Sequence, residues 1–90
     1  MTEIDLDRSY TLHPQVAVRP EPFGALLYHF GTRRLSFLKD PRLLAVVEAL
    51  GSQPTAGAAC AAAGVPDGEL PRYRRALATL ADTDMLRETP

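Results

Sequence analysis

Two apolar runs separated by a glycine constrain the fold more than any other feature of this 90-residue chain. The runs are GALLYHF and RRLSFL, and Gly31-Thr32 lies between them. Glycine at the first central position of a two-residue loop is typical of a type II′ turn, so this segment predicts a β-hairpin. The turn would pair Phe30 with Arg33 and thereby set the register of both strands.

The alternation of side chains assigns this hairpin two different faces. One face is apolar and aromatic and is expected to pack on helices; it holds Leu26, Tyr28, Phe30, Leu35 and Phe37. The other face is mixed and holds Leu27, His29, Arg34, Ser36 and Leu38. Phe37 is therefore predicted to be a core residue. With Phe30 and Arg33 as the closing hydrogen-bonded pair, the amides of Arg33 and Leu35 would point inward, and those of Arg34 and Ser36 outward.

Proline, glycine and capping residues divide the rest of the chain into one strand and three helices. A short edge strand is predicted around residues 16–19, between two prolines. Asp40-Pro41 begins a helix that ends at Gly51. The alanine-rich segment 55–63 predicts a second helix. A third begins at 67 or 68 and closes with Met85 and Leu86. Its apolar residues recur at the spacing of an amphipathic helix, and Leu77 is expected to pack in the core; they are Leu70, Tyr73, Leu77 and Leu80.

These elements predict an α+β fold, in which a three-stranded antiparallel sheet is followed by three helices. The second and third helices would form a helix-turn-helix, so the architecture is winged helix-turn-helix-like. Residues 1–9 include three acidic residues and are expected to form a flexible acidic arm, and residues 10–90 a single domain. The chain has no apolar run of about 18 residues and no signal-peptide pattern, so we expect a cytoplasmic protein.

The sequence offers little for catalysis. His13 and His29 have no carboxylate cluster nearby in sequence and make a poor metal site, so they are interpreted as a turn residue and a residue on a solvated strand face. Cys60 lies among alanines and is expected to be buried and inert. The glycines are scattered and form no phosphate-binding loop. We therefore predict no catalytic residue, no metal and no cofactor.

Basic residues gather in two places. Four lie around the second hairpin strand and three on the third helix: Arg33, Arg34, Lys39 and Arg42, and Arg72, Arg74 and Arg75. Two kinds of function fit this pattern. A DNA-binding regulator would place the third helix in a groove. A peptide-binding module would add an extended ligand to the open edge of RRLSFL. The net charge of -1 disfavours nucleic acid as a partner and favours the peptide.

The run RPEPFGALLYHFGTRRLSFL, and with it most of the chain from His13 to the third helix, resembles the mycofactocin-system peptide chaperones. These are small PqqD-like proteins of the RiPP recognition element class. The resemblance implies a winged-helix domain without catalytic residues or cofactor. It would bind the leader of a ribosomally made precursor peptide and present it to a radical SAM maturase.

In that class the leader adds as a strand beside the third strand and rests on the third helix. Carried onto this sequence, the resemblance predicts nine peptide-binding residues: Arg33, Arg34, Leu35, Ser36, Leu38, Tyr73, Arg74, Arg75 and Leu77. The same open strand edge would also allow two copies of the chain to form a homodimer.

Overall fold

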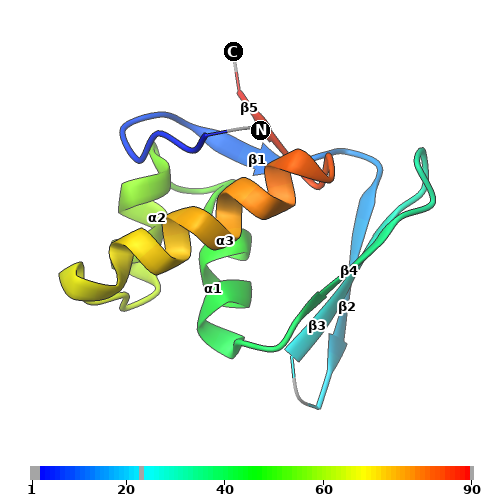
Figure 1. Cartoon of the computed structure of the whole chain (residues 1–90), viewed down its shortest axis with the longest axis horizontal. Coiled ribbons are helices and arrows are strands. Elements are labelled where there is room, and N and C mark those ends of the chain that lie inside the picture. The colour runs from blue at the N-terminus through cyan, green and yellow to red at the C-terminus, as the bar shows by residue number, and fades with distance from the viewer. Residues whose placement is uncertain (1–2, 23, 90) are drawn as a thin grey trace.

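The predicted hairpin forms the middle strand and one edge strand of a three-stranded antiparallel sheet in a computed structural model, which describes residues 3–22 and 24–89. The strands are β2 (Val16–Glu21), β3 (Gly24–His29) and β4 (Leu35–Leu38), in that order across the sheet. The helices that follow are α1 (Pro41–Ala49), α2 (Ala56–Ala62) and α3 (Leu70–Asp82), with a short 3-10 helix η1 (Asp67–Glu69) before α3. The sheet lies to one side of the three helices (Figure 1). The α+β prediction is thus confirmed.

The register of the hairpin is as predicted, but its turn is not. Tyr28 pairs with Leu35 and Leu26 with Phe37. The chain reverses through a four-residue loop, Phe30–Arg33, in place of a two-residue type II′ turn. The carbonyl of His29 accepts a hydrogen bond from the Arg33 N–H at 2.7 Å, and Arg33 has a φ of 62°. A residue in the left-handed region closes the longer loop without shifting the strand pairing.

The two faces of the hairpin are the reverse of the prediction. Ala25, Leu27 and His29 of β3 and Leu38 of β4 are buried against the helices. Phe37 is 44% exposed and Leu35 is 60% exposed, so both lie on the outer face. The prediction that Phe37 is a core residue is therefore wrong. His29 is not on a solvated face either, because only 1% of its surface is exposed.

A second sheet joins the two ends of the domain. Strands β1 (Tyr10–Leu12) and β5 (Leu86–Glu88) pair antiparallel, which the sequence did not predict. The third helix is accordingly shorter than predicted, since α3 ends at Asp82 and a turn with Asp84 at a φ of 65° leads into β5. Met85 and Leu86 still reach the core, but from this turn and strand rather than from the helix.

The first two helices begin and end as predicted. The Asp40 side chain caps α1 by accepting a hydrogen bond from the Arg42 N–H, and Pro41 occupies the first turn. The Thr55 side chain caps α2 by accepting from the Ala58 N–H. The small residues of α2 allow it to pack closely, and Ala56, Ala59 and Cys60 are fully buried. Within the described part of the chain, no helix is long and apolar enough to cross a membrane.

The segment predicted as a flexible acidic arm contributes to the core. Its residues 1–2 lie outside the described residues. In the remainder, Ile4 is only 3% exposed and Leu6 packs against the core cluster. The carbonyls of Leu6 and Arg8 accept hydrogen bonds from the Gly57 and Ala56 N–H groups at the start of α2, each at 2.8 Å. The domain boundary that we drew after residue 9 does not mark the edge of the core.

Candidate functional site

The outer edge of β4 is the first part of the candidate site. β4 pairs with β3 on one side only, so it is an edge strand of the sheet. The His29 N–H donates to the Arg34 carbonyl at 3.0 Å, which makes His29 and Arg34 a hydrogen-bonded pair. Alternation along the ladder then directs the Ser36 N–H toward β3 and the Leu35 N–H away from it. Our prediction had these directions reversed, because it closed the hairpin with the wrong turn.

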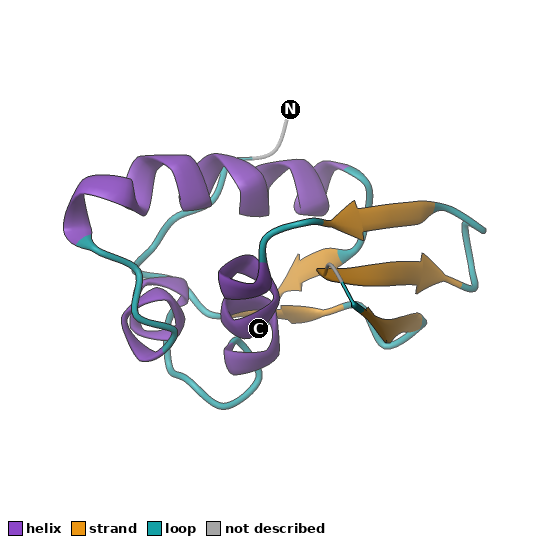
Figure 2. Ribbon diagram, turned by 90° about the horizontal axis from the view of Figure 1, so that it is seen from below, coloured by secondary structure: helices purple, strands orange, loops and turns teal. Residues whose placement is uncertain are grey.

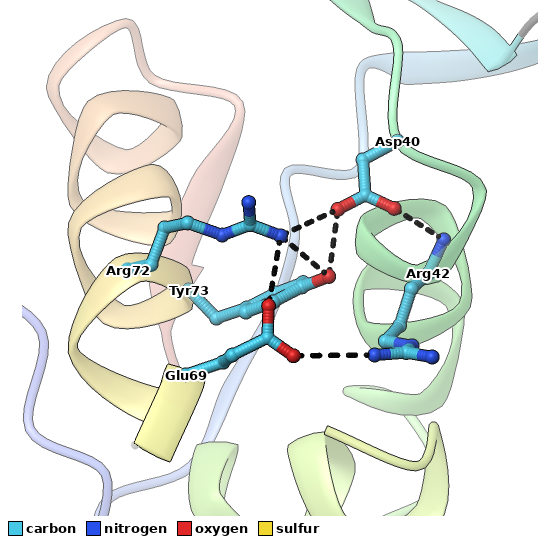
Figure 3. Close-up of polar contacts among 5 residues, drawn as sticks. All are labelled: Asp40, Arg42, Glu69, Arg72 and Tyr73. Carbon is cyan, nitrogen blue, oxygen red and sulfur yellow. Dashed lines mark hydrogen bonds and ion pairs between the residues drawn. The ribbon is translucent and has the colours of Figure 1, made fainter. Parts of the chain in front are cut away.

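A cluster of charged and polar side chains lies at the end of β4, between α1 and α3 (Figure 3). The Tyr73 hydroxyl donates a hydrogen bond to Asp40 Oδ2 at 2.6 Å. The Arg72 guanidinium contacts the same oxygen at 3.4 Å and Glu69 Oε1 at 3.3 Å. Glu69 Oε2 in turn faces Arg42 at 3.5 Å. One carboxylate, that of Asp40, thus caps α1 and also holds the first turn of α3.

These contacts change the acidity of the groups involved. The hydrogen bond from Tyr73 is the main cause that lowers the pKa of Asp40, and the backbone N–H groups of the α1 cap and the Arg72 charge act in the same direction. The pKa of Tyr73 is raised, first by burial and then by its hydrogen bond to Asp40. At neutral pH the pair is therefore a neutral phenol bound to a carboxylate.

The nine predicted site residues do not form one surface. Arg33, Arg34 and Leu35 are exposed along the hairpin and Ser36 is half-buried, so these four follow the edge of β4. Leu38, Tyr73 and Leu77 are buried in the core. The role of Tyr73 is to bind Asp40, which nothing local in the sequence indicates because the two residues are 33 positions apart.

Arg74 and Arg75 lie in a different environment from Arg72. They line a hollow of about 220 Å³ together with Glu3, Ile4 and residues of the second half of α3. Arg74 also borders a wider opening along the N-terminal segment, next to Asp5 and Asp7. Since Arg72 faces Asp40 and Glu69, the basic cluster predicted on the third helix is divided between two sides of the molecule.

His13, His29 and Asp84 meet beside the hairpin loop, where their ligand atoms lie within 4.8 Å of one another. The Nδ1 atom of His29 accepts hydrogen bonds from the Gly31 and Thr32 N–H groups at 3.0 and 3.1 Å. In the neutral ring Nε2 then carries the hydrogen, and it lies 3.6 Å from Asp84 Oδ2. His13 likewise uses Nδ1 to accept from the Gln15 N–H.

Because both Nδ1 lone pairs are engaged with backbone amides, the two rings offer N–H donors at Nε2 and no lone pair for a metal ion. The group does not fit a metal site. It has a structural role instead, since His29 satisfies two amides of the four-residue loop from inside the core. Cys60 is also structural: it is fully buried, and burial raises the pKa of its thiol.

Comparison with known proteins gives a consistent result. Residues 9–87 match the model of the peptide chaperone MftB family. Among curated proteins, peptide chaperone MftB of Mycobacterium tuberculosis is 59% identical over 94% of this chain and 78% of the relative's length. The protein of the same name from Mycobacterium ulcerans is 61% identical over 91% and 75% of the two chains, and that from Mycolicibacterium smegmatis is 56% identical over 91% and 80%.

No solved structure matches this chain. The family match spans the three-stranded sheet, the three helices, β1 and the first two residues of β5, and the identities extend over nearly the whole domain. The chain therefore belongs to the peptide chaperone MftB family.

Proposed function

We propose that this chain is a peptide chaperone that binds the leader of a ribosomally synthesised precursor peptide. The leader pairs as an additional strand with the outer edge of β4, and the chaperone presents it to a radical SAM maturase in mycofactocin biosynthesis. The chain itself carries out no reaction. In this proposal the helix-turn-helix of α2 and α3, with the sheet beside it, is a winged-helix-like frame that holds the leader.

The observation that carries the proposal is the open edge of β4. An edge strand presents backbone N–H and C=O groups that pair with any extended chain, so affinity arises from the main chain. The alternation of hydrogen-bonded pairs along the hairpin directs the Leu35 N–H toward this ligand. The exposed guanidinium groups of Arg33 and Arg34 at the loop end of the strand favour a leader that carries carboxylates.

The polar cluster supports the proposal because it holds α3 near the other end of β4. Asp40 follows β4 by two residues, and its contacts with Tyr73 and Arg72 attach the first turn of α3 there. The leader strand then lies along an edge whose two ends are defined, by the four-residue loop at one end and by this cluster at the other.

Two copies of the chain can use the same edge for pairing. In the proposed function such a homodimer competes with the leader, because one row of backbone groups cannot serve both partners. Sedimentation of the protein with and without excess leader checks this: a dimer that uses the edge dissociates when leader is added.

A proline at position 35 tests the proposed edge. It removes the outward N–H of Leu35 and leaves the ladder bonds to β3 in place, so the protein should fold while leader binding weakens about tenfold, the loss of about one hydrogen bond. Leu35→Ala is the matched control, because it shortens the same side chain but keeps the N–H. The measurement is titration of a labelled leader peptide into each variant, with circular dichroism as the check of folding. Equal leader affinities for Leu35→Pro and Leu35→Ala would contradict binding of the peptide at this edge.

A further inference from the structure

The outer face of the three-stranded sheet is apolar on β3 and β4, while β2 adds Ala17 and an ion pair between Arg19 and Glu21 at 3.3 Å. Two cross-strand rows make up most of it: Arg19, Leu26 and Phe37 in one row, and Ala17, Tyr28 and Leu35 in the other. Phe30 lies beyond the second row, and its ring is 4.9 Å from that of Tyr28 in an edge-to-face contact. Figure 2 shows that the sheet extends away from the three helices, so no helix of the described residues covers this face.

A sheet face that contacts only solvent does not require so many apolar side chains. The outward side of an antiparallel sheet is usually polar, with the apolar residues on the inner side. Among the residues that the structure describes, the large hydrophobic residues with exposed side chains are Phe30, Leu35 and Phe37, and all three belong to this one face. Apolar side chains concentrated in one exposed patch, aromatic ones above all, mark a surface that binds another protein.

Basic residues border this face at both ends. Arg33 is exposed at the loop end, and Lys39 is exposed at the opposite end of β4, where Glu21 lies on the same face in an ion pair with Arg19. If a second copy of the chain stacked on the face, it would bring together two borders of net positive charge, which is electrostatically unfavourable. A surface with an apolar centre and carboxylates around it fits both features. The face therefore suits a different protein better than it suits a second copy.

The position of this face relative to β4 indicates which protein that is. A leader strand added to β4 would widen the same sheet by one strand, and every second leader side chain would lie beside Leu35 and Phe37. A protein docked here would contact the chaperone and the leader together. We propose that the outer face is the docking surface for the maturase, an inference that rests on the function proposed above. The maturase contributes an apolar patch surrounded by carboxylates.

The test places carboxylates on the face but away from the edge of β4. Ala17 lies on β2 and Phe30 in the loop, and both are exposed, so the double variant Ala17→Glu/Phe30→Glu should fold. Binding of the purified maturase to the full chain, by biolayer interferometry, should weaken at least about tenfold. Leader affinity should stay within about twofold, because the double variant leaves the edge of β4 unchanged. Ala61→Glu, on the exposed side of α2, is the matched control and should change neither affinity.

Other outcomes have clear meanings. Unchanged maturase affinity in the double variant overturns the proposal. If the double variant also loses a homodimer while its maturase affinity is unchanged, the face binds a second copy of the chain instead. If the double variant melts early, Phe30→Glu alone makes the same comparison, because it changes a loop residue that is 60% exposed. Absence of leader binding by the unaltered protein would reject the function proposed above, and the maturase measurement would still report on this face.

Discussion

Asp40 connects α1 and α3 through one carboxylate. Its Oδ1 accepts the N–H of Arg42 and so caps α1, while its Oδ2 accepts the Tyr73 hydroxyl and faces Arg72. The sequence predicted only the cap, because capping is a local pattern of Asp followed by Pro. The bond to Tyr73 depends on how α3 packs on α1, which no local pattern contains.

The charge on Asp40 should make stability depend on pH. Its pKa is lower in the folded chain than in the unfolded chain, so the carboxylate stabilises the fold above about pH 4, and this contribution is lost as the pH falls through the folded-state value. Asp40→Asn keeps a capping oxygen but not the charge, and should cost about 1 kcal/mol at pH 7. Urea unfolding of both proteins at pH 7 and at pH 3 measures the difference, which should shrink at the lower pH. A difference that is constant or grows on acidification would contradict the role given to the charge.

At the scale of the element, the β3–β4 hairpin shows which structural features a sequence pattern can predict and which it cannot. The register follows from two apolar runs around a glycine and is confirmed, but the strands are shorter than the runs because Phe30, Arg33 and Arg34 lie outside β3 and β4. Which face meets the helices does not follow from apolar content. The outward face, with Tyr28, Phe30 and Phe37, is at least as apolar as the inward one. The inward face even holds His29, whose Nδ1 atom accepts hydrogen bonds from two amides of the loop.

Comparison of two hairpin residues tests this inversion. Leu27 is fully buried, so Leu27→Ala should cost about 2–5 kcal/mol of unfolding free energy. Phe37 is 44% exposed, so Phe37→Ala should cost less, about 1 kcal/mol, despite the larger side chain. Chemical denaturation of the two variants gives both values. The assignment of faces fails if Phe37→Ala is the more destabilising change.

The candidate site was predictable to the same extent as the hairpin. The edge of β4 follows from the order of strands, so the sequence predicts Leu35 and Ser36 on it, with Arg33 and Arg34 at its loop end. The direction of the amides was wrong, because it depends on whether the loop has two residues or four. The surroundings of Arg74 depend on long-range packing with the N-terminal segment, which composition does not reveal.

At the scale of the whole molecule, the two ends of the chain close the domain together. β1 pairs with β5, the Thr89 N–H donates to the Ser9 carbonyl, and Arg8 forms an ion pair with Glu88 at 2.7 Å. The first and last described segments lie side by side at one end of the molecule (Figure 1). This closure lies away from β4, which remains an edge strand of the three-stranded sheet with Leu35 and Phe37 exposed on its outer face.

The N-terminal segment should therefore contribute to stability, although its acidic composition suggests a free arm. Ile4 is 3% exposed within the core cluster, so Ile4→Ala should lower the free energy of unfolding by about 2–5 kcal/mol. Glu3→Ala is the control, since Glu3 is an exposed neighbour and its loss should change stability by no more than about 0.5 kcal/mol. Urea unfolding of the two variants beside the unaltered protein decides the question. Equal stabilities for Ile4→Ala and Glu3→Ala would mean that the segment is a free arm. If Ile4 packs in the core, its truncation leaves a cavity or makes the neighbouring side chains collapse, and either change lowers the free energy of unfolding.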